Sequence, residues 1–123
     1  MESDVTTVRA DARYNPTGIT VTAGQTIRVT APGEWEDWGR IVDANGYEKT
    51  LLRPFTLLRR VRSAPWFRLC GAIGASEAHL FPLGNEASHV APASGPLYLF
   101  ANDLWAMYWN NSGELEVSVV VSD

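Results

Sequence analysis

Hydrophobic and polar residues alternate along most of this chain. Residues 18–22 and 26–30 are apolar at every second position, and residues 114–121 repeat the pattern with Leu115, Val117, Val119 and Val121. A period of two is typical of a β-strand that buries one face. The pattern therefore predicts strands over these three segments, and residues 5–10 and 96–101 are suited to two more.

Turn residues separate the predicted strands. Ala23-Gly24-Gln25 joins two of them tightly, Asn45-Gly46 is a strong turn signal, and a Pro- and Gly-rich break spans residues 91–96. Helical periodicity is almost absent, so residues 49–65 are predicted to form a long loop with room for a short helix around 55–61. Short strands between such turns indicate an all-β protein, an antiparallel β-sandwich of the jelly-roll kind, in one domain over residues 1–123.

Composition narrows the classes of protein. With 46% hydrophobic and 20% charged residues the chain is expected to fold, and its net charge of −4 argues against nucleic acid as a partner. Between Lys49 and Ser76 there are six basic residues and no acidic one. That segment is either a patch for a polyanion or, as we favour, a solvated face with acidic neighbours elsewhere in the fold.

The single cysteine and the N-terminal residues say little about the function. Cys70 is the only cysteine, so no intrachain disulfide is expected, and its apolar neighbours indicate a small buried side chain. The first residues lack the apolar run of a secretory signal, and no segment reaches the length of a membrane span. The expected compartment is the cytoplasm, with export by a signal-less route as the alternative.

The segment from Asn102 to Gly113 carries the most chemistry. It combines one carboxylate, three side-chain amides and three large aromatic residues between two predicted strands. Carboxylate and amide oxygens are ligands that Ca²⁺ prefers, and flat aromatic faces suit a sugar ring. Taken alone, Asn110-Asn111-Ser112-Gly113 is also typical of an ordinary turn.

These residues resemble the PA-I-type galactophilic lectins, a family of calcium-dependent bacterial β-sandwiches. The resemblance covers most of the chain and is strongest at Asn102-Asp103 and at Tyr108 through Gly113. It implies a Ca²⁺ held by the side chains of Asp103, Asn110 and Asn111 and by the carbonyl oxygens of Met107 and Trp38. It also implies that two vicinal hydroxyls of a hexose complete the coordination of the ion.

The chain departs from that family in its specificity loop. The galactose-specific members carry a His and a Gln there, and residues 47–66 contain neither. Galactose or another hexose is therefore the expected ligand, and the predicted sugar contacts are Asp103, Leu104, Trp105, Trp109 and Asn110.

The sequence also bears on two other classes of function. A hydrolase would need a nucleophile or a paired acid and base, and no segment has such a context, so no catalytic residue is predicted. The alternative to a lectin is a protein-interaction or assembly module that has kept the fold and uses the Trp- and Arg-rich loop. A lectin gains avidity from several copies, so a homo-oligomer is expected.

Overall fold

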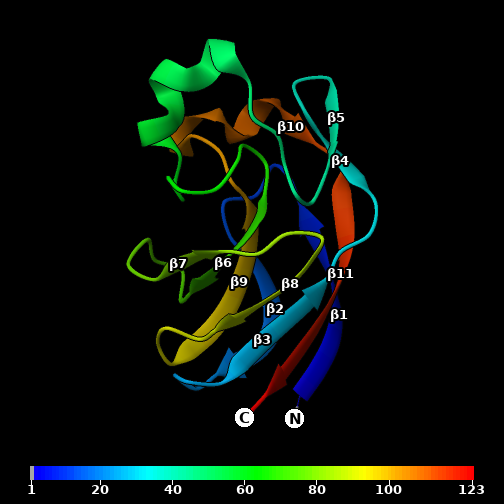
Figure 1. The fold of residues 1–123 in the computed structure, drawn as a ribbon. Coiled ribbons are helices and arrows are strands. Elements are labelled where there is room, and N and C mark those ends of the chain that lie inside the picture. The colour runs from blue at the N-terminus through cyan, green and yellow to red at the C-terminus, as the bar shows by residue number, and fades with distance from the viewer. Residues whose placement is uncertain (1) are drawn as a thin grey trace.

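The computed structural model describes residues 2–123 and confirms an all-β antiparallel sandwich (Figure 1). Eleven strands and two 3₁₀ helices follow one another along the chain. Their bounds are β1 Glu2–Arg9, β2 Asn15–Val21, β3 Thr26–Thr30, β4 Glu34–Asp37, β5 Arg40–Asp43, η1 Thr50–Leu58, β6 Leu69–Ile73, β7 Leu80–Pro82, β8 Glu86–Val90, β9 Gly95–Ala101, η2 Trp105–Asn110, β10 Asn111–Ser112 and β11 Glu114–Ser122.

The strands form three sheets. Two four-stranded sheets, in the orders β1-β11-β3-β8 and β2-β9-β6-β7, make the layers of the sandwich. A small sheet in the order β10-β4-β5 lies at one end. The pairing of β10 with β4 joins two segments far apart in sequence, with Asn111 opposite Asp37.

The core lies between the two large sheets, where the alternating residues meet. Ile19, Val21, Ile27 and Val29 are buried, as are the four alternating apolar residues of β11, Leu115, Val117, Val119 and Val121. The period-two pattern thus predicted both the strands and the face that each one buries. Cys70 is also buried, and burial raises the pKa of its thiol to about 12, which is typical of an unreactive packing residue.

Two local predictions need correction or refinement. Residues 23–25 do form a tight turn, with the Gln25 amide donating to the Thr22 carbonyl at 3.0 Å. However, β2 and β3 belong to different sheets, so this turn crosses between layers and does not close a hairpin. The long loop does hold a short helix, but η1 begins earlier than expected, at Thr50.

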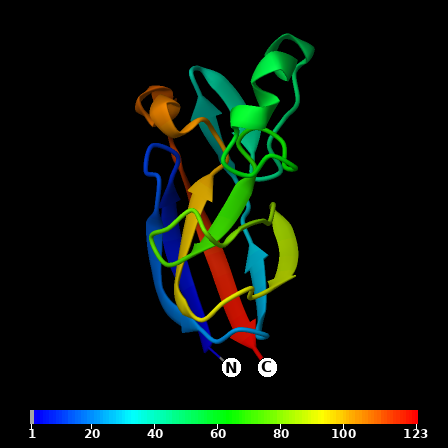
Figure 2. The same ribbon diagram turned by 90° about the vertical axis from the view of Figure 1, so that its left-hand side faces the viewer.

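Both helices lie at one end of the sandwich. The helices η1 and η2 and the hairpin β4–β5 cluster there, and both termini lie at the opposite end (Figures 1 and 2). Among the residues that the structure describes, no helix is long and apolar enough to cross a membrane.

Candidate functional site

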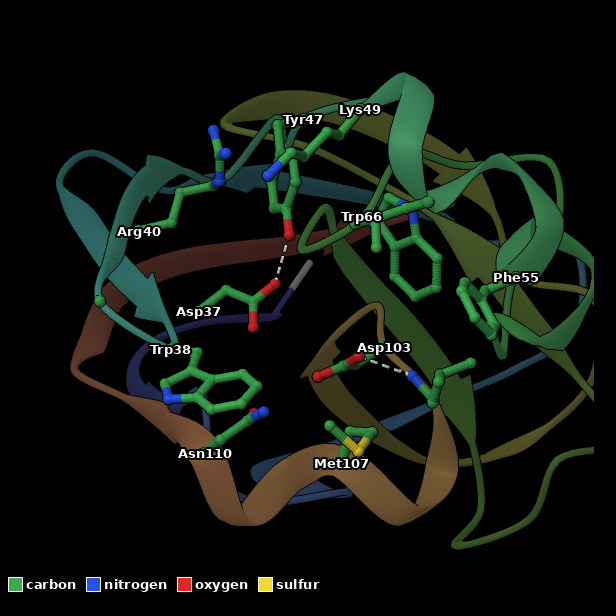
Figure 3. Close-up of a pocket in the computed structure, with 13 residues that line it drawn as sticks. Asp37, Trp38, Arg40, Tyr47, Lys49, Phe55, Trp66, Asp103, Met107 and Asn110 are labelled. Carbon is green, nitrogen blue, oxygen red and sulfur yellow. Dashed lines mark hydrogen bonds between the residues drawn. The ribbon is translucent and has the colours of Figure 1, made fainter.

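A cavity of ≈ 770 Å³ opens at the end that carries both helices (Figure 3). Three parts of the chain line it: the β4–β5 hairpin, the long loop after β5, and the stretch that runs from the end of β9 through η2. The lining residues are Asp37, Trp38, Gly39, Arg40, Tyr47, Lys49, Leu52, Phe55, Trp66, Asp103, Leu104, Met107 and Asn110.

Most of the predicted ligand residues meet in this cavity. Trp38, Asp103, Met107 and Asn110 all line it, and their side chains surround one central space (Figure 3). Asn111 follows Asn110 directly as the first residue of β10, where its amide donates to the Ala10 carbonyl at 2.9 Å. The structure thus brings together residues that the resemblance named from separate parts of the sequence.

Three buried oxygen atoms at this site have no hydrogen-bond donor. Within residues 2–123, six buried side-chain nitrogen or oxygen atoms lack a partner. Three of them are N–H donors, and the other three are Asp103 Oδ2, Asn110 Oδ1 and Asn111 Oδ1. All three unpaired acceptors therefore belong to the three residues predicted to bind Ca²⁺ through their side chains. An unpaired buried oxygen is costly, and a cation bound at this position would satisfy all three of these oxygens.

The turn between β4 and β5 places Trp38 beside Asn110. Trp38 and Gly39 both have positive φ, 45° and 85°, as the two central residues of a type I′ hairpin turn require. A bulky residue is rarely found in this conformation, and such backbone strain is concentrated at functional sites. The Trp38 amide donates to the Asn110 carbonyl at 3.1 Å, which fixes this hairpin against the end of η2.

Asp103 has an unusual electrostatic environment. Its side chain is buried, with 5% exposure, and Oδ1 accepts a 2.7 Å hydrogen bond from the Leu104 amide. Burial raises the pKa of Asp103 to about 7, and the negative charge of Asp37 acts in the same direction. A buried carboxylate with one unpaired oxygen is suited to hold a positive ion.

This pKa predicts how the stability of the metal-free protein depends on pH. Because the folded-state pKa lies above the ordinary value of 3.8, folding favours the protonated carboxyl, and stability falls as the pH rises from about 4 to about 7. We expect Asp103 to account for a loss of about 2–3 kcal/mol between about pH 5 and pH 8. Urea unfolding in chelator should show that Asp103→Asn removes this loss. An identical pH dependence in wild type and variant would contradict the prediction.

Asp37 lines the cavity, although the sequence analysis did not predict it as a site residue. It is paired with Asn111 across β4 and β10, and directly opposite residues of an antiparallel pair project from the same face. Its Oδ2 accepts a 2.5 Å hydrogen bond from the Tyr47 hydroxyl, and the Arg40 guanidinium lies 4.7 Å from the centroid of the Tyr47 ring. A second carboxylate is therefore held at the edge of the predicted metal site. The sequence did show a signal, the acidic residues Glu34, Glu36 and Asp37 beside Trp38, but such a cluster is also typical of a solvated loop.

The predicted sugar-contacting tryptophans are not equivalent. Trp109 is highly exposed, and its ring lies 6.0 Å from that of Trp38, which lines the cavity. Neither Trp105 nor Trp109 is among the residues that line the cavity, and Trp105 packs against Arg13, whose guanidinium lies 4.8 Å from its ring centroid. The cavity wall facing Trp38 is formed instead by Trp66 and Phe55 from the long loop (Figure 3).

Two arginines of the basic segment, residues 49–76, stabilise the fold. Arg60 is almost fully buried, donates to Glu77 and to the Tyr108 hydroxyl, and stacks 3.6 Å from the centroid of the Phe100 ring. Arg59 is also buried and pairs with Glu48 at 2.6 Å. These two arginines have acidic partners, as the favoured interpretation predicted, but their side chains are buried and do not belong to a solvated face. Their pairing leaves fewer cations for a polyanion.

The comparisons with known proteins agree with a lectin-like protein. One solved structure is described as "EclA N-terminal domain; PllA-like lectin". It is 25% identical, with a TM-score of 0.65, and the match covers 99% of this chain and 97% of that one. No family model matches the chain, and no curated protein does. The likeness supports a lectin-like family and the sandwich fold without selecting the PA-I type.

Proposed function

We propose that this protein is a calcium-dependent lectin that recognises a hexose at the cavity between η1 and η2. The observation that carries the proposal is the set of three unpaired buried oxygens on Asp103, Asn110 and Asn111. The likeness of the fold to a lectin domain also supports the proposal. We infer binding without catalysis, since no nucleophile or acid–base pair is predicted.

The residues fit Ca²⁺ better than other metal ions. Within residues 2–123 no cluster of three His, Cys, Asp or Glu side chains could hold a metal, so the donors would be one or two carboxylates with amide and carbonyl oxygens. Such a set of hard, mostly neutral oxygens suits Ca²⁺, whereas Mg²⁺ requires a tight octahedron and Zn²⁺ favours nitrogen or sulfur. When bound, the ion would supply positive charge that attracts hydroxyl oxygens of a sugar.

Both Asp37 and Asp103 contribute negative charge to the proposed calcium site. A single carboxylate would predict weak binding, because calcium affinity rises with the number of charged ligands. Asp37 adds a second carboxylate, and the hydrogen bond that it accepts from the Tyr47 hydroxyl orients this side chain. We therefore propose that Asp37 strengthens binding of the ion even where it does not contact it.

The tryptophan at the hairpin is proposed to contact the sugar. Trp38 is 74% exposed and Trp109 is 71% exposed, and together they form an aromatic surface beside Asn110. A sugar ring presents one apolar face, so stacking on an indole buries area without requiring new polar partners. The hexose would then be oriented by the ion and covered by this aromatic pair.

A tryptophan series tests the proposal. Trp38→Ala or Trp109→Ala should weaken hexose binding by about 1–3 kcal/mol, since each loses apolar contact with the ring. Trp105→Ala should leave binding unchanged and serves as the matched control. The measurement is calorimetric titration with common hexoses in calcium and again in chelator. Binding that persists in chelator would refute metal-mediated recognition, and no binding to any hexose would refute the lectin proposal.

A further inference from the structure

Large exposed hydrophobic residues are concentrated at one end of the molecule. Within residues 2–123 ten such side chains are exposed, and eight of them belong to η1, η2 or the β4–β5 hairpin. They are Trp38, Ile41, Leu51, Phe55, Leu57, Leu58, Trp105 and Trp109. The other two, Val5 and Val90, are on β1 and β8 of the sandwich body. We call the eight residues the apolar ring.

The helix η1 is the most unusual part of this ring. Five of its nine residues are large and apolar, yet none is buried. Leu52 and Phe55 face the cavity, whereas Leu51, Leu57 and Leu58 remain 73%, 71% and 63% exposed. A helix on a soluble domain normally packs its apolar face against the core, so these leucines indicate an external partner.

Cations without acidic partners accompany the exposed leucines. Lys49, Arg53 and Arg62 flank them in sequence, and none of the three takes part in an ion pair within the described residues. Glu48, the acidic residue next to η1, is already paired with Arg59. The exposed surface around η1 is therefore apolar and basic although the whole chain carries a net charge of −4.

This combination fits a lipid bilayer better than a second copy of the chain. Two copies related by a two-fold axis through η1 would bring their Lys49 and Arg53 side chains together, which is unfavourable. Exposed Leu, Phe and Trp side chains next to Lys and Arg are typical of proteins that lie in the interface of an anionic membrane. The cations would contact lipid phosphates and carboxylates while the leucines enter the acyl boundary.

We propose that the apolar ring docks this protein onto a membrane surface that contains anionic lipid. The helices η1 and η2 stand at the end of the molecule away from both termini, so the ring reaches a flat surface without obstruction from the sandwich (Figures 1 and 2). Because the cavity opens between these elements, docking also presents the cavity to lipid headgroups. This last consequence rests on the proposed function, whereas docking itself does not.

Vesicle binding provides the test. Wild-type protein in chelator should sediment with vesicles of phosphatidylcholine and phosphatidylserine. Its tryptophan emission should shift to the blue on binding, because Trp38 and Trp109 belong to the apolar ring. Binding should weaken with added salt and on vesicles of phosphatidylcholine alone. The double variant Leu57→Glu/Leu58→Glu should lower the partition onto anionic vesicles by about tenfold or more, because it places charge where apolar contact is required.

A matched control uses the exposed valines outside the ring. Val5→Glu/Val90→Glu carries the same added charge and should reduce partition far less. Equal losses in the two double variants, or no sedimentation of folded wild type, would overturn the proposal. A wild-type dimer that Leu57→Glu/Leu58→Glu converts to monomer, without vesicle binding, would overturn it in favour of an interface between copies. Chelator throughout keeps these outcomes separate from any failure of calcium or sugar binding.

Discussion

Asp103→Ala should abolish measurable calcium binding. The substitution removes the only fully buried carboxylate of the site and leaves the Asn110 and Asn111 oxygens, which are neutral, facing a divalent ion. Calcium affinity depends strongly on the number of charged ligands, so we expect a loss of about 100-fold or more, equivalent to about 2.7 kcal/mol. Calorimetric titration with Ca²⁺ is the direct measurement, supported by the calcium-dependent rise in melting temperature.

Two further variants test whether calcium affinity depends on the charge of Asp37. Asp37→Asn should weaken calcium binding by a smaller factor, about tenfold, because Asp37 is held at the edge of the site by Tyr47. Glu36→Gln removes the same charge from the adjacent residue of β4, whose side chain projects from the opposite face, and should have little effect. Wild-type protein that ignores millimolar Ca²⁺ would refute the metal site. Equal losses in Asp37→Asn and Glu36→Gln would refute the role of Asp37.

Gly46→Ala should be the most destabilising single change in the loop that forms the cavity wall. A Cβ at this position would lie 2.2 Å from the Trp66 carbonyl oxygen and 2.6 Å from the Arg68 nitrogen, both backbone atoms that cannot rotate away. The residue also has a positive φ of 76°, which disfavours any side chain. We expect a loss of about 3 kcal/mol or more in the free energy of unfolding.

Gly24→Ala separates the cost of the steric clash from the cost of the backbone strain at positive φ. Gly24 also has positive φ, 94°, but a Cβ there would meet no atom within 4 Å. Its substitution should therefore cost only the backbone strain, about 1–2 kcal/mol. Denaturant unfolding of both variants in chelator gives the comparison, and losses of equal size would show that the contact with residues 66–68 is unimportant.

The fold and part of the site were predictable because their signals are local. Alternation in β2, β3 and β11 identifies both the strand and its buried face within a few residues. The three residues that we propose as side-chain calcium ligands, Asp103, Asn110 and Asn111, are likewise close in sequence, so one segment holds most of the proposed donors. Sequence patterns of this length are short enough to be recognised without knowledge of the tertiary structure.

The rest of the site depends on contacts between distant segments. Asp37 reaches the cavity because β4 pairs with β10, and Trp66 reaches it because an isolated bridge with Tyr47 closes the base of the long loop. Neither pairing has a sequence signature. Trp105 and Trp109 look alike in the sequence, but residues four apart in a 3₁₀ helix lie on different faces. Only the structure shows that Trp109 is near Trp38 and that Trp105 is not.

The side chain of Asn102 connects the two walls of the cavity by hydrogen bonds. Its Oδ1 accepts from the Val61 amide at 2.9 Å, and its Nδ2 donates to the carbonyl oxygens of Val61 and Ala64. This buried amide thus ties the return of the long loop to the residue that immediately precedes Asp103. A ligand that immobilises Asp103 would also restrain the loop that carries Phe55 and Trp66. The two walls of the cavity are therefore expected to order and loosen as one cooperative unit.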